Sequence, residues 1–411
     1  MRKHLFTIIV MSALAALPAG ADTVLAIHLE EGDSLGAFLD DASVPDSLVI
    51  SGVATARDIL DLRDYISRNG TVRGVNFLDL NLPDNRFPGW SMTIYRSNTS
   101  LKHITLPRNL EGIGTAAFMY LEHLETVDIP EGLTYIEPRA FFDCQSLRDI
   151  RLPDGLKSIG HNAFVQTRKL TSIVLPASLR ELGEYAFMRS AISGVITVPE
   201  GIDTLRACTF EYCNRLKKVV LPDGLKVIGG FALSGTAVET IDFPLALDSI
   251  GPYAFSRCRI EEVSLPESVR YIDARAFDDC ASLRSVMLSA GLDSISPSAF
   301  SGCSALRTVR SMRFTPPGIA NSNVMDTENP HPYTPGDEVT LYVPKGAAEA
   351  YRSAEWWQEF KHIVEVDVTA VSAITPAQSN ADNRFYRPDG TVAKSTTRGL
   401  YIHNGRKVVV R

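Results

Sequence analysis

Residues 147–164 read LRDIRLPDGLKSIGHNAF, and this stretch decides the fold that we expect for the whole chain. Apolar residues lie six, three and one positions before Pro153, and the last two alternate as in a short β-strand. Proline ends a strand because it has no N–H to donate, and the following Asp154-Gly155 favours a turn. The stretch therefore describes a strand, a turn and an apolar return that ends in Ala163-Phe164.

The same pattern recurs every 22 or 23 residues. The aromatic position returns nine times, with leucine in place of phenylalanine once: Phe118, Phe141, Phe164, Phe187, Phe210, Leu233, Phe255, Phe277 and Phe300. The proline keeps the same step from Pro107 to Pro266, and Ser289 takes its place in the ninth unit. Two markers with one period indicate an internal array of about nine repeats.

One such unit cannot bury its apolar face alone, so neighbouring units must stack as the coils of a solenoid. We expect one short strand per coil, in a parallel sheet with strands about 4.8 Å apart. The phenylalanines should then form one continuous column through the interior. Truncating one of them should leave a cavity and destabilise the whole rod.

The repeat unit resembles the leucine-rich repeats of BspA-like bacterial surface proteins. It follows the pattern Leu-x-x-Ile-x-Leu-Pro-x-x-Leu-x-x-Ile-Gly-x-x-Ala-Phe-x-x-Cys and is nearly whole in residues 147–164 and 216–228. The resemblance implies an α/β-type repeat solenoid: a curved horseshoe with short parallel strands on the concave face, an irregular or 3-10 convex side and helix-bearing caps. It also implies adhesion to host extracellular proteins or to other bacteria.

Five segments are predicted along the chain. The first, residues 1–21, has a basic start, an apolar run and the small residues Ala19-Gly20-Ala21, which is typical of a signal peptide cleaved near Ala21. No later apolar run reaches membrane-spanning length, so we expect a protein that is secreted or associated with the cell surface or outer membrane, without a transmembrane anchor. The other segments are an N-terminal cap with atypical first repeats at 22–100, the array at 101–311, a loop with a C-terminal capping unit at 312–370, and a short β-rich tail at 371–411.

Two alternatives concern the C-terminal segments. Apolar residues from Ala347 to Phe360 recur at helical intervals, which favours a cap on the last coil, although Trp356-Trp357 could instead form an exposed platform for a carbohydrate. The tail predicts a hairpin with an Asn404-Gly405 turn. It is similar to type IX sorting domains, and the alternative is a plain β-hairpin cap.

The cysteines follow the repeat. Five of the six lie three positions after the aromatic column: Cys144, Cys213, Cys258, Cys280 and Cys303. We expect buried thiols that pack as small apolar side chains. A disulfide between successive coils is the alternative, because the coil spacing falls within the Cα distances that a disulfide spans in an exported protein. Zinc is not expected, because the spacing is far from short paired ligand motifs.

Charge and motifs narrow the class of function. The chain has 41 Lys and Arg against 48 Asp and Glu, and its net charge of -7 argues against a general nucleic-acid binder. The Ile-Gly pairs recur once per coil, so they belong to turns and not to a phosphate-binding loop. No histidine stands in a metal-ligand spacing or beside a nucleophile motif. We therefore expect no enzyme activity, no cofactor and no metal.

The concave sheet remains as the predicted binding surface, since repeat proteins commonly bind through it. Outward residues lie five, four and two positions before each proline, and valines give this face an apolar middle with a polar surround. The candidate partner-binding residues are Arg151, Ser172, Val174, Val195, Thr197, Lys218 and Val220. The alternative is that scattered surface valines have no function.

The predicted function is protein–protein interaction at the bacterial surface. The partner would be a protein, possible sources being the host extracellular matrix or plasma, and the chain itself would be a monomer. The alternative function is a glycan-binding or polysaccharide-processing accessory protein. Such a site needs exposed aromatic residues and paired carboxylates across a cleft, and the concave positions hold almost no aromatic residues.

Overall fold

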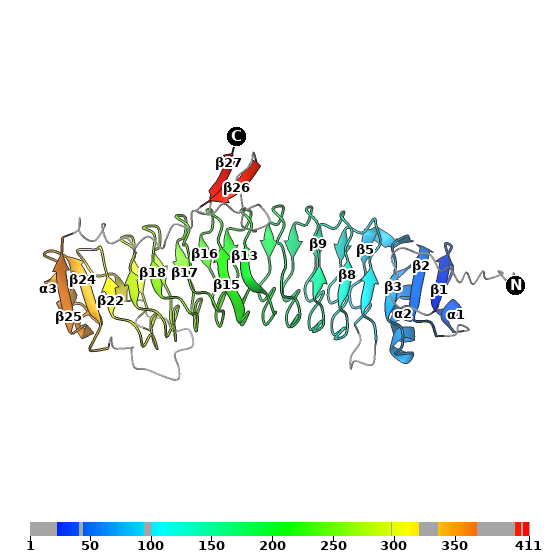
Figure 1. Cartoon of the computed structure of the whole chain (residues 1–411), viewed down its shortest axis with the longest axis horizontal. Coiled ribbons are helices and arrows are strands. Elements are labelled where there is room, and N and C mark those ends of the chain that lie inside the picture. Colours follow the sequence, from blue (N-terminus) through cyan, green and yellow to red (C-terminus); the bar gives the residue numbers. More distant parts are fainter. Residues whose placement is uncertain are drawn as a thin grey trace.

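The computed structural model describes residues 23–40, 44–93, 100–296, 298–319, 336–367, 399–403 and 406–410. The main part is a long rod of stacked coils, with parallel strands that run across its length (Figure 1). The predicted signal peptide, the residues 320–335 and most of the predicted tail lie outside the described residues. The solenoid expected from the repeat is thus confirmed.

One side of the rod, which we call the front face, carries the strands that precede the proline positions. This is the face predicted to be concave. Its first sheet is parallel and consists of β1 (Val24–Leu29), β2 (Ser47–Val53), β3 (Gly74–Asn76), β6 (His103–Thr105), β8 (Thr126–Asp128) and β10 (Asp149–Ile150), with β4 (Leu80–Asn81) beside β2. A two-stranded sheet follows, made of β13 (Ser193–Thr197) and β15 (Arg215–Val220). The last sheet contains β18 (Glu262–Ser264), β20 (Ser285–Met287), β22 (Thr308–Arg310), β24 (Thr340–Pro344) and β25 (His362–Val366).

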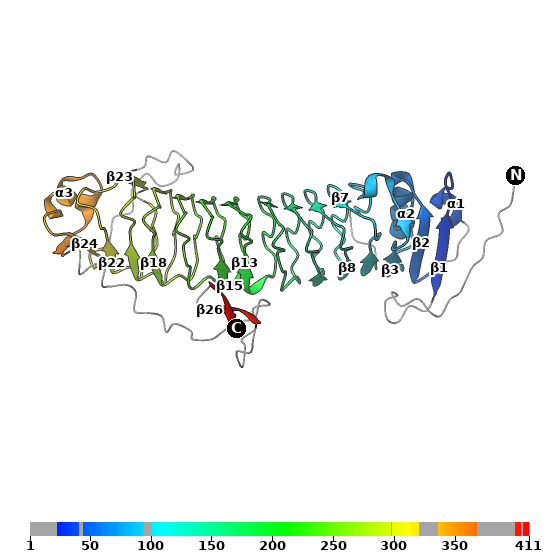
Figure 2. The same ribbon diagram turned by 90° about the horizontal axis from the view of Figure 1, so that it is seen from above.

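The opposite side, the back face, carries a second series of parallel strands that are two residues long (Figure 2). One sheet contains β5 (Arg86–Phe87), β7 (Gly112–Ile113), β9 (Tyr135–Ile136), β11 (Ser158–Ile159) and β12 (Glu181–Leu182). The other contains β14 (Thr204–Leu205), β16 (Val227–Ile228), β17 (Ser249–Ile250), β19 (Tyr271–Ile272), β21 (Ser294–Ile295) and β23 (Gly318–Ile319). The second residue of nearly every pair is a buried Ile or Leu, so the periodic aliphatic position of the sequence closes the core from this side.

The phenylalanine column fills the space between the two faces. Consecutive rings from Phe118 to Phe210 stack with centroids 5.2 to 5.6 Å apart, and Phe255, Phe277 and Phe300 stack in the same way. Leu233 separates the two stacks and is itself fully buried. The predicted column is confirmed, with one aliphatic interruption. Each buried ring contributes about 1.5–3 kcal/mol of burial free energy, so the column is a main source of stability.

The cysteine position links neighbouring coils. All six cysteines are buried free thiols, and five of them occupy the slot three positions after the phenylalanine column, as expected. The Cys144 thiol donates to the Phe118 carbonyl at 3.1 Å, and the Cys303 thiol donates to the Phe277 carbonyl at the same distance. Burial raises the pKa of Cys213 to about 12. The Cys213 thiol therefore stays protonated near neutral pH and donates to the Phe187 carbonyl.

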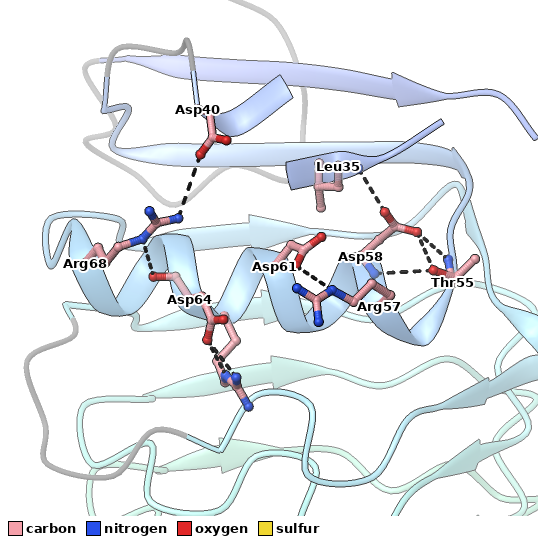
Figure 3. A network of polar contacts seen from close by, with 9 residues as sticks. Leu35, Asp40, Thr55, Arg57, Asp58, Asp61, Asp64 and Arg68 are labelled. Atoms are coloured by element: carbon pink, nitrogen blue, oxygen red, sulfur yellow. Dashed lines mark hydrogen bonds and ion pairs between the residues drawn. The ribbon is translucent and has the colours of Figure 1, made fainter. Parts of the chain in front are cut away.

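The N-terminal segment contains two helices, α1 (Leu35–Leu39) and α2 (Ala56–Arg68), with a 3-10 turn η1 (Pro83–Asn85) further along. Thr55 and Asp58 form a reciprocal cap at the start of α2. The Asp58 carboxylate also accepts from the Leu35 N–H at 2.8 Å, so one side chain caps both helices (Figure 3). Burial alone would raise the pKa of Asp58, but hydrogen bonds from Thr55 and Leu35 hold it below its usual value.

The C-terminal unit contains α3 (Ala348–Ser353) and the 3-10 turn η2 (Trp357–Glu359). The helix ends sooner than the predicted periodicity, because Ala354 is extended and Trp356 has a left-handed backbone with φ of 65°. Both tryptophans are buried, and the Trp357 indole N–H donates to the Pro317 carbonyl at 3.0 Å. The pair packs inside the last coil and does not form an exposed sugar platform.

The described part of the tail is an antiparallel pair, β26 (Gly399–His403) and β27 (Arg406–Val410). This agrees with the predicted hairpin, although its turn residues 404 and 405 lie outside the described residues. Whether the tail is a sorting signal stays a prediction.

Candidate partner-binding face

The seven candidate residues lie on four consecutive coils in the middle of the front face. Arg151 follows β10, Ser172 and Val174 lie on the next coil, and the remaining four lie on β13 and β15. These four form two pairs of direct neighbours in the parallel register, since Val195 pairs with Lys218 and Thr197 pairs with Val220. The 23-residue period therefore brings together residues that are up to 69 positions apart in the sequence.

The structure separates three valines that the sequence treated alike. Val174 is 82% exposed and Val195 is 62% exposed, whereas Val220 is half-buried. Fully burying a side chain of this kind against a partner is worth about 1.5–3 kcal/mol. Val174 and Val195 are consequently the strongest apolar contacts that this face offers.

An irregularity in the sheet positions Val195. The apolar place six residues before Pro199 holds Ser193, and Ile192, one position earlier, fills the core at 1% exposure. The register between β13 and β15 shifts after Gly194, whose φ is +71°, and this leaves Lys217 as the extra residue. β-bulges of this kind often re-aim side chains next to functional sites. The sequence signals were Ser193 and Gly194, and our prediction did not use them.

The coil that carries Val174 has no assigned strand on the front face, although residues 170–175 are fully described. The ladder of the front face stops at β10 and resumes at β13. A second interruption falls at the coil of Asp242, between β15 and β18. The candidate site therefore lies around a short, independent two-stranded sheet.

Ion pairs connect the coils on either side of the two valines. Glu125 lies between two cations, with Lys102 at 3.1 Å and Arg148 at 2.6 Å. A hydrogen bond from Lys102 is the main reason why the pKa of Glu125 lies below its usual value. On the other side, Lys218 contacts Asp242 at 3.2 Å. Such exposed pairs contribute little stability but fix the arrangement of charges that a partner meets.

A cluster of polar side chains around His103, on β6 and β8, was not predicted from the sequence. His103 Nδ1 lies 2.6 Å from the Thr126 hydroxyl, and His103 Nε2 lies 3.1 Å from an Asp128 carboxylate oxygen. The Thr105 hydroxyl donates to the same carboxylate at 3.0 Å. The order hydroxyl, imidazole and carboxylate is that of a proton relay.

The surroundings of this cluster do not extend it to a catalytic site. The Asp128 side chain is 60% exposed, and the backbone N–H groups of β6 and β8 belong to the parallel ladder and not to an oxyanion hole. We interpret the cluster as a hydrogen-bond bridge between two coils. Among the described residues, no group of three or more His, Cys, Asp or Glu is arranged to hold a metal ion.

Internal space is scarce in the described part of the rod. The cavity between Phe300 and Trp357 has a volume of about 10 Å³, which is too small for an organic ligand. A hollow of about 310 Å³ lies on the back face between β12 and β14, lined by residues that include Arg180, Glu184 and Arg206. None of the seven candidate residues lines it. In the described segments, no helix is both long and apolar enough to cross a membrane.

These features define the class of protein: a solenoid of parallel-strand coils built on leucine-rich repeats. The sequence model described as BspA type leucine rich repeat region matches residues 91–217 and 203–313, in six copies. Because these matches span more than half of the chain, the chain belongs to this family. No curated protein matches the chain.

Solved structures of similar proteins include three bacterial ones. A leucine-rich repeat protein from Bacteroides ovatus ATCC 8483 is 21% identical, with 65% of this chain and 84% of that chain covered and a TM-score of 0.41. The pneumococcal vaccine antigen PcpA is 17% identical, with 79% and 80% covered and a TM-score of 0.45. The leucine-rich repeat protein of T. pallidum is 27% identical, with 39% and 75% covered and a TM-score of 0.35.

Proposed function

We propose that this protein is an exported interaction scaffold that binds a protein partner through the middle of its front face. The observation that carries the proposal is the pair of highly exposed valines, Val174 and Val195, on neighbouring coils of a face otherwise rich in polar and ion-paired side chains. Large apolar side chains that stay in water on a rigid surface are typical of an interaction site. The polar surround comes from Arg151, Ser172, Thr197 and Lys218.

The proposed setting is the bacterial surface. The segment 1–21 has the sequence features of a signal peptide, and the BspA type family is the one whose resemblance implied adhesion to host extracellular proteins or to other cells. Binding through a preformed sheet needs no cofactor, and the proposal assigns none. We propose that the protein acts as a monomer.

The test replaces both exposed valines. The double variant Val174→Glu and Val195→Glu should no longer retain the proteins that the wild-type chain captures from host plasma or from extracellular matrix extract. Its thermal midpoint should stay unchanged, because neither side chain contributes to the core.

Leu245→Glu is the matched control, since Leu245 is 84% exposed but lies after Pro244, outside the candidate site. It should capture the same proteins as the wild type. Equal capture by all three proteins would refute the site. Equal loss of capture in the valine variant and in Leu245→Glu would mean that any exposed apolar residue can support binding. This outcome would also refute the proposed site.

A further inference from the structure

The front face carries a band of positive charge around the two exposed valines. We define the basic band as the four eight-residue segments that precede Pro153, Pro176, Pro199 and Pro222, namely 145–152, 168–175, 191–198 and 214–221. Its charged residues are seven cations and one carboxylate: Arg148, Arg151, Arg168, Lys169, Arg215, Lys217, Lys218 and Asp149. This excess is opposite in sign to the chain as a whole, which has a net charge of -7.

The coils on both sides of the basic band are acidic. The corresponding segment before it, 122–129, holds three carboxylates and no Lys or Arg. The two segments after it, 236–243 and 258–265, hold four carboxylates and only Arg259 as a cation. The positive charge is thus concentrated on the coil of Val174 and on the two coils that flank the exposed valines, while the segment of Val195 itself holds no charge.

Ion pairs tie the edges of the basic band to these acidic coils, but its centre is free of them. Arg148 contacts Glu125 and Lys218 contacts Asp242, which partly neutralises the two edges. Within the described residues, no ion pair involves the exposed Arg168 and Lys169, which lie on the inner coil of Val174, or the exposed Arg215 and Lys217, which lie on the last coil of the band. At about 4.8 Å per coil, the acidic coils lie two or three coils from Arg168 and Lys169, which is about one Debye length or more at physiological salt, so salt screens most of their field there.

We infer that the partner presents an acidic segment that also carries an exposed aliphatic or aromatic side chain. This apolar side chain packs against Val174 and Val195, and the carboxylates of the segment face the basic band. This inference rests on the proposed function and specifies the chemistry of the partner. The charges would attract the segment and fix its position, and the buried apolar contact would supply the affinity. Lys217, the extra residue at the bulge beside Val195, is the exposed cation that we place next to the apolar contact.

A polypeptide fits these observations better than a sulfated polysaccharide. Both are anionic, but a polysaccharide lacks the aliphatic and aromatic side chains that a polypeptide can bury against the two exposed valines. The four segments of the basic band contain no aromatic residue on which a sugar ring could stack. The occupant we assign is therefore an acidic protein segment.

The experiment pans the immobilised full chain with a phage-displayed library of short random peptides, and then measures the affinity of the selected peptides as synthetic molecules. We expect selected peptides that combine several Asp or Glu with at least one Leu, Ile, Val or Phe. Their affinity should fall about tenfold between about 50 mM and about 300 mM NaCl. The variant Arg215→Glu with Lys217→Glu should weaken binding by about tenfold or more.

The matched control is Arg284→Glu, because Arg284 is an exposed cation on the same face but outside the basic band, where it pairs with Glu261. It should change the affinity by less than about twofold. The inference would be overturned if the selected peptides were not enriched in Asp or Glu, or if no peptide were selected at all. It would also be overturned if the Arg215→Glu, Lys217→Glu variant bound the selected peptides as tightly as the wild type. Binding of heparin in place of peptides, with the same salt dependence, would overturn it in favour of a sulfated polysaccharide.

The variant Val174→Glu with Val195→Glu separates this inference from the proposed function. If the selected peptides bind this variant as tightly as the wild type, the proposed site is wrong. If binding is lost but the peptides are neutral and insensitive to salt, the site stands and only the acidic partner is wrong.

Discussion

The phenylalanine column and the exposed valines of the front face are both apolar and both lie on successive coils, yet they have opposite environments. Phe164 is completely buried between stacked rings, whereas Val174, ten residues later, is 82% exposed. The difference comes from position within the coil and not from hydrophobicity. A solenoid coil has room for one layer of interior side chains, so apolar residues in outward positions remain available to a partner.

The largest effect is expected inside the column. Phe164→Ala should lower the free energy of unfolding by about 3–5 kcal/mol, because the rings on both sides hold the cavity open. Thermal or denaturant unfolding followed by circular dichroism measures this loss. Arg168→Ala, at the surface of the same coil, should hardly change the midpoint, and equal small shifts in both variants would contradict the stacked core.

A smaller effect is expected at the capped N-terminal end. Asp58→Ala removes the cap of α2 and the acceptor of the Leu35 N–H, which should cost about 1–2 kcal/mol. Because the pKa of Asp58 is lower in the folded chain than its usual value of 3.8, its contribution is complete above that pH and is lost as the pH falls through the lower folded value.

Denaturant unfolding at several pH values measures this dependence. The gap in stability between wild type and Asp58→Ala should be constant near neutral pH and should narrow in acid. A gap that widened in acid would show that the carboxylate is not the stabilising form.

The cysteine slot should show an intermediate sensitivity. Cys213→Ala removes the donor to the Phe187 carbonyl and should cost about 1 kcal/mol, while Cys213→Ser keeps a donor, as Ser190 does in the same slot, and should cost less. Chemical denaturation of the two variants compares them. A larger loss for Cys213→Ser would show that apolar packing outweighs the hydrogen bond.

The smallest effect on stability is expected at the exposed valines. Val174→Thr with Val195→Thr should shift the unfolding free energy by no more than about 0.5 kcal/mol. The same variant should weaken partner binding, because the apolar contact is lost. Calorimetry and surface plasmon resonance on the same protein preparation would test the two expectations together. A large loss of stability would mean that these valines belong to the core.

Much of the fold could be predicted because the repeat reports the same geometry many times. Pro153 and five of its equivalents follow a front strand as expected, although the coils before Pro176 and Pro244 have no assigned front strand. The aliphatic position five residues before each phenylalanine formed the back strands. The helix predicted up to Phe360 was less accurate. It ended at Ser353, because the burial of Trp356 and Trp357 against the last coil outweighed local helical periodicity.

The candidate site could be predicted only in part. The period of the repeat was sufficient to place Val174 and Val195 on neighbouring coils of one face. It did not distinguish their exposure from that of the half-buried Val220, and it missed the bulge after Gly194. The cluster around His103 was also missed, because its members are joined across the sheet and not along the chain.

The sequence by itself determined the solenoid, its period, its buried columns and the outward positions of its front face. These properties follow from residue spacing, since a proline, a turn and an apolar residue at fixed steps impose the same local geometry in every coil. Only the tertiary structure decided which outward residues are exposed, where the ladder is interrupted and which charges are paired. Those properties depend on side chains about 23 residues apart that meet across neighbouring coils, and no local pattern fixes how they pack.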